Sequence, residues 1–239
     1  MNGRIIRPDS EVVLGIPRVG KLKIGKKVVS ERTGKEYPTS VDYFIPTGKY
    51  AGLFTQAYGE KPQTIQIVFP SDSAYEVCRE EYEYRDDKGA LIASGDGQRF
   101  KVWDGKRYIQ LSTEDVPTLM ESISKRYAKK TNTSEDNGWR IKLTMNFLIP
   151  MVRGVVGLWT FETNGVASSI RNCRNAYDAM LEERGYVRGA IWDMTVAFAK
   201  TQKPNDTSKF PVVSIIPNES EDNVRMIKEA MQPVKLLEK

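Results

Sequence analysis

The side chains that could do chemistry in this chain are few, because its 239 residues include no histidine and only two cysteines. Without histidine there is no Ser-His-Asp triad, no Cys-His pair and no imidazole ligand for a metal ion. Cys78 and Cys173 are too few for a zinc site built from four thiolates, and we expect both to be reduced thiols in the core. Any catalysis would depend on carboxylates, lysine or tyrosine.

The carboxylates do not form a catalytic pattern. Asp9 and Glu11 resemble the acids of a metal-dependent nuclease, but no lysine stands two residues after Glu11. The acid pairs at 80–81 and 182–183 have arginines nearby, which is typical of solvated faces. The glycine-rich segments lack the spacing of a phosphate-binding loop. We therefore expect a protein that is not an enzyme and that holds no metal ion and no cofactor.

Basic side chains gather near the N-terminus. Residues 1–35 hold nine basic and three acidic side chains, whereas the whole chain has a formal charge of +5. Segment 16–27, IPRVGKLKIGKK, contains no acid, and its apolar residues Val19, Leu22 and Ile24 are expected to anchor a strand. Val19 and Leu22 break strict alternation, so the register stays open. The cations of this segment are Arg18, Lys21, Lys23, Lys26 and Lys27.

Clustered positive charge of this kind attracts phosphates or acidic protein surfaces. We interpret the segment as a strand whose charged face meets such a partner, and a merely solvated strand face is the alternative. Reversing the charge of its four lysines is predicted to abolish partner binding without unfolding the protein.

Two further basic elements are candidates for partner or nucleic-acid binding. Arg171 and Arg174 are predicted to share the polar face of a helix with Asn175, and a loop tip carries Lys200, Lys203 and Lys209. Aromatic residues accompany the basic elements: Tyr43, Phe44, Trp103, Tyr108, Trp159 and Phe161. Basic strands interleaved with aromatics suit single-stranded nucleic acid, although an aromatic at strand period is more often part of the core.

The elements that must position these residues are mostly strands. Apolar alternation and turn residues predict strands over 21–29, 39–46, 64–70, 90–94, 98–103, 107–112, 139–150, 155–163, 189–200 and 210–217. Helices are predicted over 49–59, 71–87, 114–130, 168–185 and 220–232, the fourth capped by Ser168 or Ser169. The pattern indicates an α+β fold with mainly antiparallel sheet and a few single helices packed on it.

The segment at 130–138 has no apolar residue and is the predicted internal boundary. We expect a basic β-rich half over 1–129, a flexible loop over 130–138 and an α+β half over 139–239. The halves form either two lobes or two parts of one domain. The first residues lack the apolar stretch of a signal peptide and no run is long enough to span a bilayer, so we expect a cytoplasmic protein that does not bind a membrane.

Several segments, taken in order, resemble one phage family. They are IPRVGKLKIGKK, EYPTSVDYFIP, YGEKPQTIQIVFPSD and GALIASGDG in the first half, then GLWTFETNGVASSIRN, GAIWDMTVAFAK and FPVVSIIP in the second. Together they are similar to the recombination-directionality-factor-like proteins of phages that use large serine integrases. The resemblance spans most of residues 16–217, apart from the region around 112–138.

The resemblance implies a non-enzymatic accessory protein that binds a serine integrase, or another recombination protein, and biases it towards excision. DNA would be bound directly or through that partner, in the cytoplasm of a bacterial host. Many relatives carry a cysteine cluster after the GDG turn that reads as a zinc site. Here that stretch has no Cys or His, and Ala93 stands where a cysteine often precedes the turn, so no zinc is expected. The alternative reading is a phage single-stranded-DNA binding or annealing protein.

Overall fold

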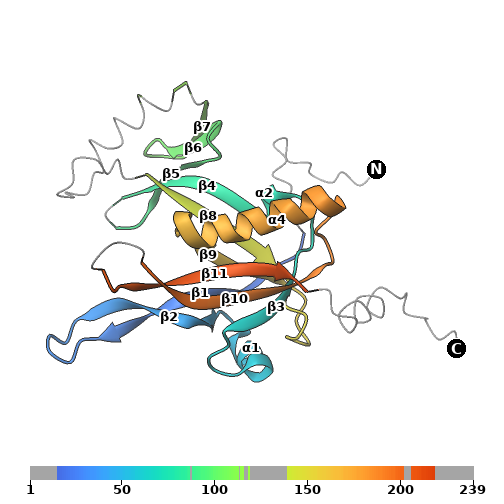
Figure 1. Ribbon diagram of the computed structural model, residues 1–239. Coiled ribbons are helices and arrows are strands. Elements are labelled where there is room, and N and C mark those ends of the chain that lie inside the picture. The colour runs from blue at the N-terminus through green and yellow to red at the C-terminus, as the bar shows by residue number, and fades with distance from the viewer. Residues whose placement is uncertain are drawn as a thin grey trace, which may run out of the picture.

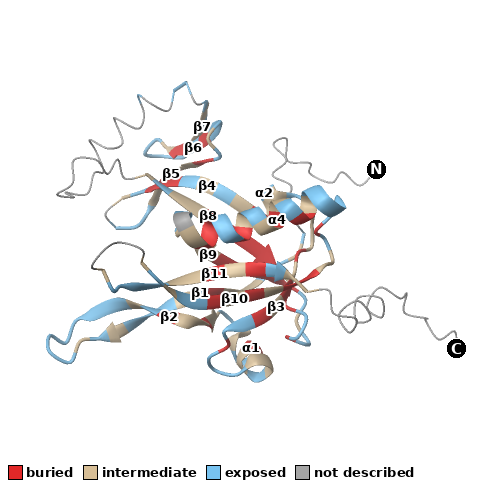
Figure 2. Cartoon of the chain, viewed as in Figure 1, coloured by how far each residue is buried: buried red, intermediate tan, exposed pale blue. Residues whose placement is uncertain are grey.

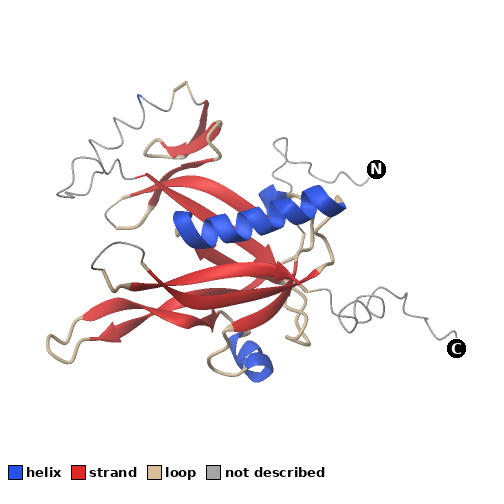
Figure 3. Cartoon of the chain, in the orientation of Figure 1, coloured by secondary structure: helices blue, strands red, loops and turns tan. Residues whose placement is uncertain are grey.

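The computed structural model describes residues 15–86, 88–112, 114, 115, 118, 139–201 and 206–218. These residues form mainly antiparallel sheet with a few helices, which confirms the predicted α+β class. Figures 1 and 3 show long strands crossed by one long helix, α4. The strands are β1 (Arg18–Val29), β2 (Glu36–Thr47), β3 (Thr64–Val68), β4 (Cys78–Arg85), β5 (Leu91–Gly95), β6 (Arg99–Trp103), β7 (Tyr108–Ser112), β8 (Trp139–Phe147), β9 (Leu158–Thr163), β10 (Ile191–Lys200) and β11 (Lys209–Pro217). The helices are α1 (Ala51–Tyr58), α2 (Ala74–Val77), the π-helical turn η1 (Val166–Ile170) and α4 (Arg171–Arg184).

The larger sheet has eight strands in the order β2-β1-β9-β8-β4-β5-β6-β7. Its pairs are antiparallel except β1 with β9, which run parallel. Strands β8 and β9, which follow segment 130–138 in sequence, thus pair with β4 and β1, which precede it. The boundary predicted at 130–138 stays a prediction, because that segment lies outside the described residues.

A three-stranded sheet, β11-β10-β3, and helix α4 pack together on one face of the larger sheet. The η1 turn that leads into helix α4 is fixed along the edge of β11, where the backbone N–H of Val213 donates to Ser169 Oγ at 2.9 Å. Cys173 Sγ contacts the carbonyl oxygen of Val213 at 3.6 Å. Ring contacts join Phe69 to Tyr177 of the helix and to Trp192 of β10. The second layer is therefore held both by apolar burial and by bonds to an otherwise open strand edge.

Strands β5, β6 and β7 form the predicted meander and have a small core of their own. This core is separate from the main one and consists of Tyr84, Ile92, Ala93, Phe100 and Val102. Asp96 and Asp104 shape the two hairpin turns, because each carboxylate accepts two backbone N–H groups of its turn. Figure 2 shows that buried residues concentrate at the centre of the molecule and that the hairpin ends are exposed.

The helix predicted over 71–87 is wrong. Only α2 is helical there, and Cys78–Arg85 form strand β4, which pairs with β8 and β5. Tyr82 and Tyr84 alternate with charged residues, and this period of two suits a strand once both neighbours are present. The predicted caps of α4 are also wrong: Ser169 is buried and bonds to β11, and the helix begins through η1.

The helix predicted over 220–232 lies outside the described residues, as does most of the helix predicted over 114–130. No described helix is long and apolar enough to cross a membrane.

Candidate partner-binding surface

The predicted basic strand is β1, and its broken alternation has a structural cause. Arg18 pairs with Leu158 and Gly20 with Trp159, so Val19 is an extra residue without a partner in β9. Such a bulge shifts the alternation of side chains by one position. Consequently Val19, Leu22 and Ile24 all contact the main core, which confirms them as the anchoring residues of the strand.

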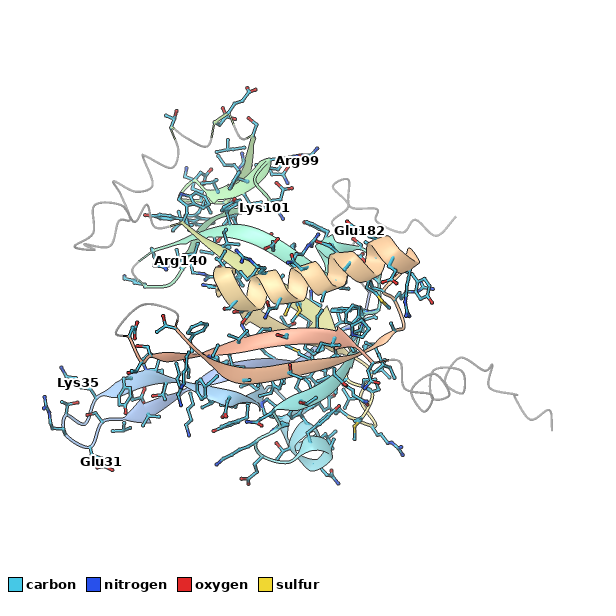
Figure 4. All side chains as sticks on the ribbon, viewed as in Figure 1. Glu31, Lys35, Arg99, Lys101, Arg140 and Glu182 are labelled. Atoms are coloured by element: carbon cyan, nitrogen blue, oxygen red, sulfur yellow. The ribbon has the colours of Figure 1, made fainter. Side chains whose placement is uncertain are left out.

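Much of the β1–β2 hairpin extends beyond the rest of the sheet. Strand β1 pairs with β9 only over Arg18–Leu22, whereas its pairing with β2 continues to Val29. Figure 1 shows this hairpin projecting from the body, and Figure 4 labels Glu31 and Lys35 at its tip. Because no third strand of the described chain pairs with β1 beyond Leu22, the edge of β1 is open there.

The five predicted cations of β1 fall into two kinds. Arg18, Lys23, Lys26 and Lys27 are exposed, and Lys27 forms an exposed ion pair with Glu36 at 3.0 Å. Lys21 is different, because it is half-buried and bonded to Glu162 of β9. Reversing the charge of Lys21 would set two acids against each other, so this residue is unsuitable for testing partner binding alone.

Lys21 is the end of a chain of alternating charges that crosses four strands of the larger sheet. We call this set the charge ladder: Arg85, Glu83, Lys142, Glu162 and Lys21. Arg85 Nε and Lys142 Nζ each lie 3.0 Å from a carboxylate oxygen of Glu83, and Lys142 Nζ lies 3.3 Å from Glu162 Oε1. The Lys142 and Glu83 side chains are largely buried, so each charge needs its neighbour to offset desolvation.

Glu162 is held ionised by the ladder. Partial burial by itself would raise its pKa, but the hydrogen bonds and positive charges of Lys21 and Lys142 outweigh that effect and hold the pKa below its ordinary value. The neighbouring Glu81 shows the opposite result: burial raises its pKa, and Arg79 offsets this only in part. The ladder therefore presents fixed charges of both signs at neutral pH.

An open cleft of about 710 Å³ lies beside the ladder, where β9 ends. Strand β9 has six residues, whereas its neighbours β1 and β8 have twelve and nine, so the sheet has a gap beyond Thr163. The cleft is lined by the charge ladder, by Ile24 and Gly25 of β1, by the turn at 163–165 and by Phe210 and Pro211 of β11. Residues of both the β1–β2 and the β10–β11 hairpin thus line it.

The predicted basic loop tip with Lys200, Lys203 and Lys209 belongs to the β10–β11 hairpin, which also lines this cleft. Lys200 and Lys209 are exposed and face each other across the two strands. Beyond Thr195 the hairpin has no third strand, because β3 pairs with β10 only over Ile191–Thr195. Lys203 lies outside the described residues. Both basic hairpins thus extend in the same general direction (Figure 1), and β2 contacts both β10 and β11.

The structure does not bring Arg171 and Arg174 into one exposed face. Arg171 is exposed, but Arg174 is half-buried against β4. Its Nε lies 2.8 Å from Asp178 Oδ2, and its Nη1 donates to the carbonyl oxygen of Cys78 at 2.8 Å. The prediction of a shared polar face is therefore wrong for Arg174, which has a structural role in fixing α4 to the end of β4.

Most of the aromatic residues that could have stacked on nucleic-acid bases are unavailable. Phe44, Trp159 and Phe161 are buried in the main core. Trp103 and Tyr108 pack against each other in the meander, with ring centroids 5.3 Å apart. Their strands, β6 and β7, lie at the end of the larger sheet that is far from β1. Exposed aromatics include Tyr37, Phe198 and Phe210 on the two hairpins, and Tyr75, Tyr82, Tyr108 and Tyr186 elsewhere.

The described residues give little basis for covalent or metal chemistry. Cys78 and Cys173 are free and buried, and burial raises the pKa of the Cys78 thiol to about 12, so it is protonated at neutral pH. Within the described ranges, no group of three or more His, Cys, Asp or Glu side chains could hold a metal ion. The absence of a metal site stays a prediction for the whole chain.

Sequence reasoning missed Lys142, Glu162 and Phe210. Lys142 and Glu162 are charged residues that alternate with apolar residues in predicted strands, and this is the signal that the sequence offers. Their ion pair could not be predicted, because it depends on how the strands pair in the sheet. The strand pattern predicts Phe210 only as the first residue of a strand, although a Lys-Phe-Pro sequence at a hairpin end places an aromatic side chain beside a cation.

The described residues thus form two sheets whose hairpins carry exposed cations. In a comparison with known families, residues 19–218 match the family described as Recombination directionality factor-like, or Gp3-like. The chain belongs to this family. No curated protein and no solved structure was found to match it.

Proposed function

We propose that this protein is a non-enzymatic accessory factor of phage DNA recombination, which binds a serine integrase in the cytoplasm of the bacterial host and shifts it towards excision. Family membership supports the recombination role. The observation that carries the binding role is the projecting β1–β2 hairpin, whose Lys23 and Lys26 are exposed and have no ion pair within the part of the chain that the structure describes.

The physical basis is a shift in population. An integrase bound to DNA has arrangements that favour integration or excision, and a factor that binds one of them more tightly raises its share. A hundredfold difference in affinity between the two arrangements corresponds to about 2.7 kcal/mol. Such a factor needs a shaped and charged surface and no reacting group.

The first test measures binding to the serine integrase encoded by the same genetic element, by isothermal titration calorimetry. Excision is then followed with purified integrase and DNA carrying the two product sites of integration. We expect saturable binding and a marked increase in excision when the protein is added. If the integrase is active but neither binds the protein nor changes direction, the proposed function is wrong.

The surface is tested with the double variant Lys23→Glu/Lys26→Glu, which leaves the charge ladder intact. We expect integrase affinity to fall at least tenfold, chiefly at low salt, with an unchanged melting temperature. Arg153→Glu is the matched control, because Arg153 is exposed in the loop between β8 and β9, at the opposite end of β9 from the cleft. Equal affinity in all three proteins would contradict a role for this hairpin.

Direct DNA binding is tested by fluorescence anisotropy with a labelled single strand and a labelled duplex at two salt concentrations. We expect weak binding to both, because Phe44, Trp159 and Phe161 on the strands beside β1 are buried, which leaves Tyr37 as the exposed aromatic paired with β1. Strong single-strand binding that weakens steeply with salt would instead support the replication or annealing function.

A further inference from the structure

Two overhanging hairpins frame the cleft, and each offers exposed apolar surface next to its lysines. Phe198 and Phe210 are 41% and 39% exposed near the end of β10–β11. Phe198 pairs directly with Pro211, which lines the cleft together with Phe210. Large apolar side chains held in solvent on a rigid hairpin are suited to a contact with another molecule.

We infer that this cleft is the docking groove for an acidic and partly apolar segment of the partner protein. The inference rests on the proposed function and adds to it the place of contact and the chemistry of the bound segment. The groove would bind apolar side chains of the segment against Phe210 and Pro211, while its acidic side chains meet the lysines on either side.

Exposed lysines stand next to cleft-lining residues in the sequence of both hairpins, although none of the four lines the cleft itself. Lys23 precedes the cleft residue Ile24, and Lys26 follows the cleft residue Gly25. On the other side Lys209 precedes Phe210 and faces Lys200 across the hairpin. These four exposed cations give the rim a positive potential, and that potential complements a segment rich in Asp and Glu.

The floor of the groove suits a polypeptide segment. Glu83 and Glu162 line it, and Glu162 is held ionised by its neighbours. Lys21, Lys142 and Arg85 line it as well, so the floor holds charges of both signs with one cation in excess. A polypeptide segment carries both donors and acceptors in its backbone, and these can bond to a ladder of alternating charges.

The groove is also of a suitable size. Its volume of about 710 Å³ is enough for a few side chains, and it is open to solvent along the hairpins, so a longer segment can continue past it. This volume lies within the range of about 300–1,000 Å³ that is common for sites binding small molecules or short segments.

The contact is mapped with the photo-cross-linking amino acid p-benzoylphenylalanine, placed at position 210 in one variant and at position 216 in another. Ile216 lies on the same strand and is exposed, but it does not line the cleft, so it is the matched control. After irradiation with the integrase and DNA, the cross-linked peptide is identified by mass spectrometry. We expect position 210 alone to cross-link, to an integrase segment that contains acidic and apolar residues.

The affinity is measured in parallel with Phe198→Ser/Phe210→Ser and with Ile216→Ser. We expect integrase affinity to fall at least tenfold for the double variant and less than twofold for the control. If the unaltered protein does not bind the integrase, the proposed function fails and the groove assignment fails with it. If it binds and the double variant binds equally well, or if position 210 cross-links to DNA or to a segment without acids, only the groove assignment is overturned.

Discussion

Single ionisable residues link the charge ladder to the pH dependence of stability. The pKa of Glu162 is lower in the folded protein than its ordinary value of 4.5, so its contribution to stability is present above that pH. This contribution is lost as the pH falls through 4.5 towards the lower value of the folded state. We predict that Glu162→Gln removes this part of the acid dependence, which urea unfolding between pH 3 and pH 7 would measure.

At neutral pH the same variant is expected to be less stable by up to about 1 kcal/mol, since Lys21 is partly exposed and its ion pair is screened. Glu182→Gln is the control, because Glu182 is an exposed carboxylate on α4 (Figure 4). Identical pH profiles for Glu162→Gln and the unaltered protein would show that the ladder does not stabilise the carboxylate.

Replacing either of two glycines by alanine is predicted to change the free energy of unfolding, in opposite directions at the two positions. A Cβ atom at Gly20 would collide with the ring of Trp159, which is buried in the core. We expect Gly20→Ala to lower the free energy of unfolding by about 1–3 kcal/mol, as overpacking does. Gly52 lies within α1 with no atom near its own added Cβ, so Gly52→Ala should raise it by about 0.5–1 kcal/mol. Thermal unfolding of both variants checks the two signs together.

At the scale of elements, one buried hydroxyl joins the η1 turn, which leads into α4, to the second sheet. Ser169 Oγ accepts the N–H of Val213, an edge group that no neighbouring strand of the described chain pairs with. We predict that Ser169→Ala lowers the free energy of unfolding by about 1–3 kcal/mol, because a buried N–H loses its acceptor. Asn172→Ala is the control, since its bond to Ser214 is exposed. A urea unfolding midpoint equal to that of the control would contradict this role.

Most elements could be predicted from local sequence, and the failures have physical causes. Asp-Gly turns and alternation identify the meander, and Gly185 ends α4 in a left-handed conformation as expected. The sequence of β4 predicts a helix, because its acids and the preceding serines favour a helix start, whereas pairing with β8 and β5 makes it a strand. The cations of β1 were found from composition, but the ladder and the cleft depend on contacts between strands far apart in sequence.

For the molecule as a whole, two separate cores predict two levels of local stability. The main core joins both sheets and α4, whereas the meander depends on a few residues around Phe100 and Val102. We predict that native-state hydrogen exchange shows lower opening free energies for β5, β6 and β7 than for β8 and β9. Equal opening free energies in both groups of strands, matching global unfolding, would mean that the protein opens as a single unit.

The parallel pairing of β1 with β9 also has a consequence for the nascent chain during synthesis, because the two strands are far apart in sequence. Lys21 and Glu162, which meet across this pair, are separated by 141 residues. At synthesis rates of about 5–20 residues per second, β1 is synthesised roughly 7–28 s before β9. During that interval one edge of β1 is open to pairing with other chains. The cations along β1 are the kind of residue that discourages such pairing, so they are expected to limit aggregation on the ribosome before any partner is met.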